Sequence, residues 1–208
     1  MDKTVYVVDD DEAVRTALVR SIGLRGYDVQ VFENAEQFLE SAEVTYPSCL
    51  LLDVRMPGIS GMELQEQITT SDWRIPIIFI TGHGDIPMSV RAVKKGAVDF
   101  LVKPYLVDTL LTRIEQAIEL SNQWHAEDED RQELLSRYAT LTQREQDVFR
   151  LLVAGAADAS NKQIARQLEI SHRTVDDHRA RIMTKMQARS LTELVEMAGK
   201  CNMRNSTA

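Results

Sequence analysis

The chain has 208 residues, enough for two domains of about 100 residues each, and its 44% hydrophobic and 27% charged residues exclude a fibrous or largely disordered protein. It contains no run of about 18 apolar residues and no signal-peptide pattern, so we expect a cytoplasmic protein with no membrane partner. The net charge of −8, taken over the whole chain, argues against a nucleic-acid partner.

Short apolar runs alternate with amphipathic segments over the first 120 residues. Each run has the length of a strand, and the segments between them carry apolar residues at helical spacing. The predicted strands are Thr4–Val8, Tyr27–Phe32, Cys49–Leu52, Ile75–Thr81 and Asp99–Val102. Because parallel strands need crossover connections, this alternation predicts an α/β doubly wound, flavodoxin-like domain over residues 1–120 with five parallel strands. Such a domain binds its ligand at the carboxyl ends of the strands.

A long stretch without Gly or Pro follows, from residue 106 to about 138, and its middle is the acidic run 127–130. This run is either a flexible linker or part of a helix that continues between two domains. We favour the helix, because apolar spacing resumes at Leu134 and Tyr138. The acidic run then acts as a spacer or contacts basic residues of the second domain, and we favour the spacer. The predicted division is a domain at 1–120, a linker helix at 121–137, an all-α domain at 138–200 and a tail at 201–208.

Acidic residues follow the first and third predicted strands. Asp9, Asp10, Asp11 and Glu12 come after the first strand, and Asp53 comes after the third. In the common strand order 2-1-3-4-5 these two strands are neighbours, so the carboxylates converge. Like charges at one place are costly without a cation, and oxygen ligands suit Mg²⁺ or Mn²⁺. An acidic run after a strand is also typical of an ordinary helix N-terminus, and Asp11 is assigned no ligand role.

Two further residues are expected at the same edge of the sheet. Thr81 ends the fourth strand, and Lys103 follows the fifth. A metal, a carboxylate, a hydroxyl and an ammonium together suit a phosphoryl group: Asp53 attacks the phosphorus, and the metal and Lys103 neutralise the phosphoryl oxygens. Each residue alone would favour an ordinary turn or strand end. Their arrival at one edge favours the phosphoryl site.

Residues 4–120 resemble the receiver domain of two-component response regulators. The segments 80–88 (ITGHGDIPM) and 96–104 (GAVDFLVKP) are similar to the FixJ branch of that family in particular. The resemblance implies that Asp53 accepts phosphate from a sensor histidine kinase. His83 is interpreted as a loop residue that shapes the neighbouring segment, because no second histidine lies nearby in the sequence.

The same resemblance implies roles for the residues around the phosphorylated aspartate. Asp10 would ligate Mg²⁺ directly, Asp9 would hold the ion through water, and the main-chain carbonyl of Arg55 would complete the protein ligands. Thr81 and Phe100 match the family's switch pair, in which the hydroxyl turns toward the phosphate and the aromatic ring turns inward.

Two other functions share parts of this pattern. A phosphatase with an aspartyl-phosphate intermediate would use Asp53, but such enzymes typically carry a second Asp two residues later, where this chain has Arg55. A flavodoxin-like electron carrier needs a hydroxyl- and glycine-rich phosphate loop after the first strand, and the four acids there would repel a phosphate. We therefore expect a regulator rather than an enzyme or an electron carrier.

The charge is unevenly distributed along the chain. Residues 1–125 hold 11 basic and 19 acidic residues, a net of −8, and residues 126–208 hold 13 of each. Within 161–189 there are 7 basic and 3 acidic residues, a net of +4. The whole-chain value therefore does not exclude a nucleic-acid partner for the second domain.

Two short helices joined by a tight turn are predicted in this basic segment. Residues 162–170 form the first helix and the turn, and Ser171 can cap a second helix in which Val175, Ile182 and Met186 face the core. A helix-turn-helix places its second helix in the major groove of DNA. The exposed face of that helix carries Arg173, Thr174, Asp177, His178, Arg181 and Lys185. From charge alone, a helical hairpin with a basic solvated face is an equally good interpretation.

The wider pattern resembles the LuxR-type DNA-binding domain over about residues 136–200. The matching segments are 141–145 (LTQRE), 161–165 (NKQIA) and 170–179 (ISHRTVDDHR). The resemblance implies that Lys162 contacts a backbone phosphate, that four residues face or flank the groove, and that the last helix, 191–198, pairs two copies. The four residues are Thr174, Val175, His178 and Arg179, and the exposed face of the helix adds Arg173 and Lys185.

Two departures from the family pattern prevent a prediction of the operator. The loop 155–161 is about three residues longer than usual, and Asp176 and Asp177 place two carboxylates on the reading helix. The expected protein is a phosphorylation-dependent homodimer, with the surface around the fourth helix and fifth strand as its dimer face. Its expected partners are a sensor histidine kinase and promoter DNA, with RNA polymerase as a further candidate.

Overall fold

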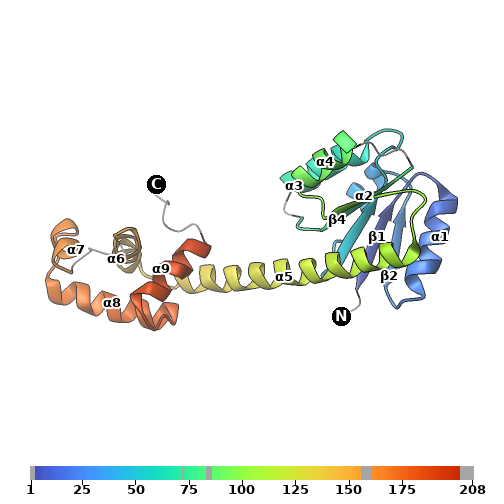
Figure 1. The fold of residues 1–208 in the computed structure, drawn as a ribbon. Coiled ribbons are helices and arrows are strands. Elements are labelled where there is room, and N and C mark those ends of the chain that lie inside the picture. The colour runs from blue at the N-terminus through green and yellow to red at the C-terminus, as the bar shows by residue number, and fades with distance from the viewer. Residues whose placement is uncertain (1–2, 72, 83–85, 156–160, 202–208) are drawn as a thin grey trace. The chain divides into compact units, whose positions relative to one another are not determined.

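The computed structural model describes residues 3–71, 73–82, 86–155 and 161–201 (Figure 1). The chain divides into two compact units, residues 1–126 and 127–208, and each is described by itself. Among the described residues, no helix is both long and apolar enough to span a membrane.

The first unit contains a five-stranded parallel sheet in the order β2-β1-β3-β4-β5. Its strands are β1 (Thr4–Val8), β2 (Asp28–Phe32), β3 (Ser48–Leu52), β4 (Ile77–Thr81) and β5 (Asp99–Val102). The predicted fold class and strand order are therefore confirmed. Three strands begin one or two residues away from the predicted starts, at Asp28, Ser48 and Ile77.

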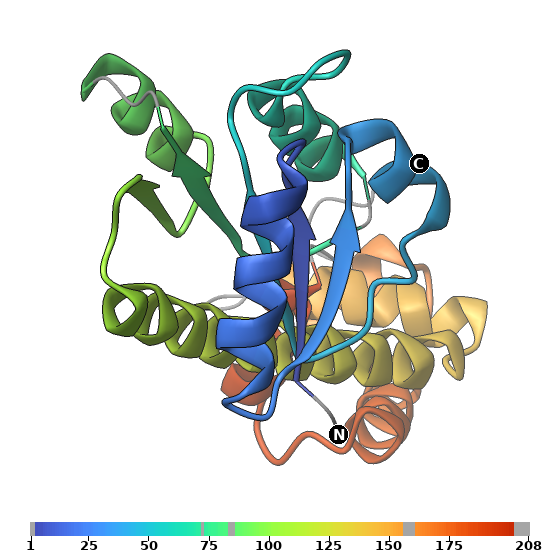
Figure 2. The same cartoon turned by 90° about the vertical axis from the view of Figure 1, so that its right-hand side faces the viewer.

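Helices cover both faces of the sheet and bury its central strands on both sides. The helices of the first unit are α1 (Glu12–Gly23), α2 (Ala35–Ser41), α3 (Gly61–Thr70), α4 (Ile86–Lys94) and the first part of α5 (Val107–Ala139). In β1, Val5 and Val7 pack with α1 and α5, whereas Tyr6 and Val8 pack with α2 and α3. Figure 2 shows α1 in front of the sheet, and Figure 1 shows α2, α3 and α4 on the side away from α1.

The helix α5 is continuous through the acidic run 127–130. This is the helix that we favoured over a flexible linker. Whether the run acts as a spacer stays a prediction.

The second unit is helical and packs around one core. It contains the end of α5 together with α6 (Gln143–Ala154), α7 (Asn161–Gln167), α8 (His172–Met186) and α9 (Leu191–Lys200). Val175, Ile182 and Met186 are fully buried in this core, as the helical spacing predicts. Between α7 and α8, Glu169 has a φ of 54°, in the left-handed region that a tight turn uses. Ser171 caps α8 by accepting a hydrogen bond from the Thr174 backbone N–H at 3.1 Å.

Candidate functional site

Three carboxylates meet at the carboxyl edge of the sheet. Asp9 follows β1 and Asp53 follows β3, and the two strands are hydrogen-bonded neighbours. The ladder continues past the strands, since the backbone N–H of Asp53 donates to the carbonyl of Val8 at 2.8 Å. Carboxylate oxygens of Asp9, Asp10 and Asp53 all lie within 4.8 Å of one another. The convergence predicted from the strand order is therefore confirmed.

Asp53 combines a buried side chain with a carboxylate oxygen, Oδ1, that accepts no hydrogen bond. Burial raises the pKa of the Asp53 carboxyl above its usual value; the charge of Lys103 opposes this shift and that of Asp9 adds to it. A buried carboxylate oxygen without a partner is costly unless something binds it. The oxygen-only donor set and this open acceptor fit a hard divalent cation such as Mg²⁺.

Lys103 pairs with Asp9 in this structure. Its Nζ lies 2.7 Å from Asp9 Oδ2, and the Asp9 side chain is almost fully buried. Burial would lower the pKa of Lys103, but the hydrogen bond and charge of Asp9 raise it overall. The ammonium therefore stays protonated at the edge of the site.

Asp11 caps α1 and is outside the three-carboxylate cluster. Its Oδ1 accepts hydrogen bonds from the backbone N–H groups of Ala13 at 2.8 Å and Val14 at 3.4 Å. The ordinary helix-terminus interpretation of the acidic run thus holds for this residue, while Asp9 and Asp10 belong to the site.

The loop after Asp53 is held by backbone contacts that only glycine permits. A Cβ atom on Gly61 would lie 2.1 Å from the Asp53 carbonyl oxygen, and Gly58 has a φ of +75°. Glu36, which was not among the predicted site residues, accepts a hydrogen bond from the Ile59 N–H at 3.0 Å. Arg55 is exposed on this loop, and the role of its carbonyl stays a prediction.

The residues of the predicted switch pair end up on adjacent strands. Thr81 is 1% exposed at the end of β4, and its carbonyl accepts from the Lys103 N–H at 2.8 Å. Phe100 is half-buried on β5, with its ring centroid 6.1 Å from that of Phe79. His83 lies outside the described residues.

The helices α7 and α8 present most of the residues predicted to contact DNA. Lys162 and Arg173 are exposed, and Thr174, His178 and Arg179 are partly exposed. Asn161 links the two helices, because its amide donates to Asp176 and its carbonyl oxygen accepts from Arg179. The longer loop at 156–160 lies outside the described residues.

Two of the predicted DNA contacts have other roles in this structure. Val175 has no exposed surface, so it belongs to the core. Lys185 turns toward α6: its Nζ lies 2.7 Å from Glu145 Oε2 and 3.0 Å from the Thr140 carbonyl oxygen. The Glu145 side chain is only 2% exposed. Burial raises the pKa of Glu145, but hydrogen bonds from Lys185 and Thr142 lower it overall.

Two family models match the chain. The response regulator receiver domain matches residues 5–115, and the domain of bacterial regulatory proteins of the luxR family matches residues 139–198. The chain belongs to the response regulators. It combines a receiver domain with a LuxR-type DNA-binding domain, the organisation of a regulator that controls transcription in response to phosphorylation.

Similar proteins extend over nearly the whole length of this response regulator. It is 42% identical over 201 residues to the transcriptional regulatory protein FixJ of Bradyrhizobium diazoefficiens, covering 97% of each chain. It is 44% identical over 196 residues to the response regulator protein TodT of Pseudomonas putida, covering 93% of this chain and 84% of TodT. Among solved structures, the response regulator StyR has a TM-score of 0.76 at 45% identity, covering 96% of this chain and 100% of StyR. Full-length FixJ from B. japonicum has a TM-score of 0.57 at 42% identity, covering 97% and 98%.

Proposed function

We propose that this response regulator accepts a phosphoryl group on Asp53 from a sensor histidine kinase. A carboxylate oxygen of Asp53 forms the bond to phosphorus as the bond between phosphorus and the kinase histidine nitrogen breaks. The observation that carries this proposal is the buried Asp53 Oδ1 without a partner, beside Asp9 and Asp10. Asp9, Asp10 and Asp53 would hold Mg²⁺ or Mn²⁺, which supplies positive charge to the phosphoryl oxygens when bound.

The surrounding residues prepare the site for added negative charge. The ammonium of Lys103 lies beside the cluster, where it is paired with Asp9, and it could also donate a hydrogen bond to a phosphoryl oxygen on Asp53. The Thr81 hydroxyl would turn toward that group, and Phe100 would repack inward. In this way the chemistry at Asp53 is converted into a change of packing on β4 and β5.

A change at β5 would reach an apolar surface of the receiver domain. Val90 and Val93 on α4 and Val102 on β5 are each about half exposed, at 46%, 51% and 47%. Exposed valines at neighbouring elements suit contact with another protein surface better than contact with water. We propose that this surface joins two copies after phosphorylation, which would place two DNA-binding domains on a two-fold site.

The DNA contacts would come from the exposed and partly exposed residues of α7 and α8. Lys162 and Arg173 suit phosphate contacts, and Thr174, His178 and Arg179 face or flank the groove. Val175 and Lys185 are left out of this set, because Val175 is buried and Lys185 neutralises the buried carboxylate of Glu145 on α6.

Mass spectrometry tests the phosphorylation site. Incubation of the full chain with a small phosphodonor and Mg²⁺ should add one phosphoryl group to the wild type and to Asp11→Asn, which keeps the helix cap. Asp53→Ala should gain none. Equal labelling of Asp53→Ala would refute the assignment.

DNA fragments selected from a random pool by the phosphorylated protein test the second domain. Lys162→Ala and Arg179→Ala should weaken binding to the selected fragments at least several-fold, whereas Arg144→Ala on α6 should not. Unchanged binding by both α7 and α8 variants would refute the proposed DNA surface.

A further inference from the structure

One polar residue lies on the packed face of α3. The buried positions of this helix are Gly61, Leu64, Gln65 and Ile68, which follow the spacing of a single apolar stripe. Gln65 is 1% exposed, and burying a side-chain amide is costly unless it is hydrogen-bonded. The buried amide of Gln65 therefore needs hydrogen-bond partners within the protein.

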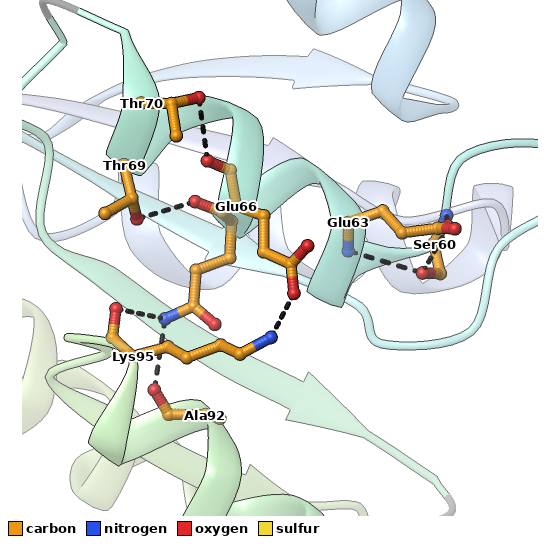
Figure 3. Close-up of polar contacts among 8 residues, drawn as sticks. Ser60, Glu63, Glu66, Thr69, Thr70, Ala92 and Lys95 are labelled. Carbon is orange, nitrogen blue, oxygen red and sulfur yellow. Dashed lines mark hydrogen bonds and ion pairs between the residues drawn. The ribbon is translucent and has the colours of Figure 1, made fainter.

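The partner of Gln65 is the C-terminal end of α4. Its Nε2 donates hydrogen bonds to the carbonyl oxygens of Ala92 at 3.1 Å and Lys95 at 3.2 Å (Figure 3). The Lys95 carbonyl lies just past the last residue of α4 and has no partner within the helix, so the amide supplies one. The Ala92 carbonyl also accepts from the Ala97 N–H, and there the amide is an additional donor. We call these two hydrogen bonds the α3–α4 clamp.

The end of α4 is well defined where the clamp holds it. Gly96 has a φ of +95°, and the Ala97 N–H donates to the Ala92 carbonyl at 3.1 Å, as in a Schellman motif. An exposed ion pair between Lys95 and Glu66 lies beside the clamp (Figure 3). Such exposed pairs contribute little, so the buried amide is the stronger of these two polar links between the helices.

The clamp joins two elements that are adjacent in sequence to parts of the phosphorylation site: α3, which follows the Asp53 loop, and the end of α4, which precedes β5. The helix α3 begins next to the Asp53 loop, since the Gly61 N–H donates to the Val54 carbonyl at 3.1 Å. The end of α4 is followed by β5, which carries Phe100. Just before β5, the Val98 N–H donates to the carbonyl of Ile77, the first residue of β4, at 2.8 Å. A displacement of α4 relative to α3 must therefore strain or break the clamp.

We propose that Gln65 is a positioning residue whose amide holds α4 in the unphosphorylated arrangement, so that phosphorylation must work against it. This inference rests on the function proposed above. Hydrogen bonds weaken outside a donor–acceptor range of about 2.7–3.2 Å, so a shift of α4 by about 1 Å would break both. The net strength of two such bonds corresponds to about a tenfold change in the equilibrium between the two arrangements.

The substitution Gln65→Met removes the clamp with little change in volume. The variant loses both donors and also loses Oε1, which is buried and has no hydrogen-bond partner in the native structure. An apolar side chain on this stripe should therefore keep the fold. Lys95→Ala is the matched control, because it breaks the ion pair with Glu66 and keeps the Lys95 carbonyl.

Beryllofluoride, an anion with the geometry of a phosphoryl group, tests the proposal by calorimetric titration in the presence of Mg²⁺. The full-length Gln65→Met variant should bind it about tenfold more tightly than the wild type, whereas Lys95→Ala should stay within about twofold. An affinity of Gln65→Met equal to or below that of the wild type would overturn the role of Gln65. Asp53→Ala serves as the blank and should not bind.

Hydrogen exchange gives a second readout that does not depend on the anion. Without beryllofluoride, the amides of residues 93–97 should exchange faster in Gln65→Met than in the wild type, with no matching change in α1. If the wild type binds no beryllofluoride, the proposed phosphorylation site fails, and this comparison still decides the clamp. Equal exchange in the wild type and Gln65→Met would overturn the clamp, whether or not Gln65→Met is less stable overall.

Discussion

The ion pair between Lys185 and Glu145 predicts that Lys185→Met lowers stability and leaves the DNA contacts intact. Removing one partner of a fully buried pair costs about 3–5 kcal/mol. The Lys185 side chain is 33% exposed, so solvent reduces the cost, and we expect a loss of about 1–2 kcal/mol. For a domain of this size, such a loss lowers the melting temperature by about 5–10 °C.

The pH dependence of this loss has a definite sign. The pKa of Glu145 is lowered in the folded protein, so its contribution to stability is present above the unfolded value and disappears as the pH falls through the folded value. Lys185 supplies part of that lowering through its hydrogen bond and its charge. The difference in unfolding free energy between the wild type and Lys185→Met should therefore shrink as the pH falls below about 4.3.

Salt dependence separates this structural role from a DNA contact. A lysine that contacts a phosphate contributes about 0.9 to the slope of log K against log salt concentration. Lys162→Met should reduce the slope by about that amount, whereas Lys185→Met should leave it unchanged, when both are measured well below the melting temperature. A slope reduced by about 0.9 in Lys185→Met, with normal stability, would refute this reasoning.

Three further predictions concern backbone contacts. Gly61→Ala should lose about 1–3 kcal/mol of stability and slow phosphorylation, because its Cβ would collide with the Asp53 carbonyl oxygen. Gly23→Ala is the control, because the space around its Cβ is open, and equal melting temperatures of the two variants would contradict this prediction. Asp11→Ala should cost about 1 kcal/mol in chemical denaturation, and Asp11→Asn should recover most of it unless the cap is unimportant. Ser171→Ala should speed hydrogen exchange at the Thr174 amide at the start of α8, and unchanged exchange there would show that this cap contributes nothing.

The features that the sequence predicted well depend on local pattern and on topology. Five short apolar runs were enough for the sheet, and the strand order alone brought Asp9 and Asp53 together, because neighbouring parallel strands end at one edge. The core positions of α8 followed from helical spacing. In each case the information lies within one element or in a general rule of connection.

The features that it missed depend on partners that are distant in the chain. Lys185 was placed on the exposed face of α8, but Glu145, 40 residues earlier, binds it. Glu36 and Gln65 contact backbone groups that no side-chain pattern records. Gln65 could have been flagged as a polar residue in an apolar stripe, although the acceptors at the end of α4 could not have been named.

Residues of α5 belong to the cores of both units. Ala117 and Ile118 pack against the sheet, whereas Leu134 is 7% exposed in the core of the second unit. The thiol of Cys201 also donates to the Arg131 carbonyl at 3.8 Å. A DNA-binding fragment that starts at residue 139, where the match to the luxR family begins, would lack both Leu134 and the Arg131 carbonyl. An independently folding fragment should therefore start no later than Arg131.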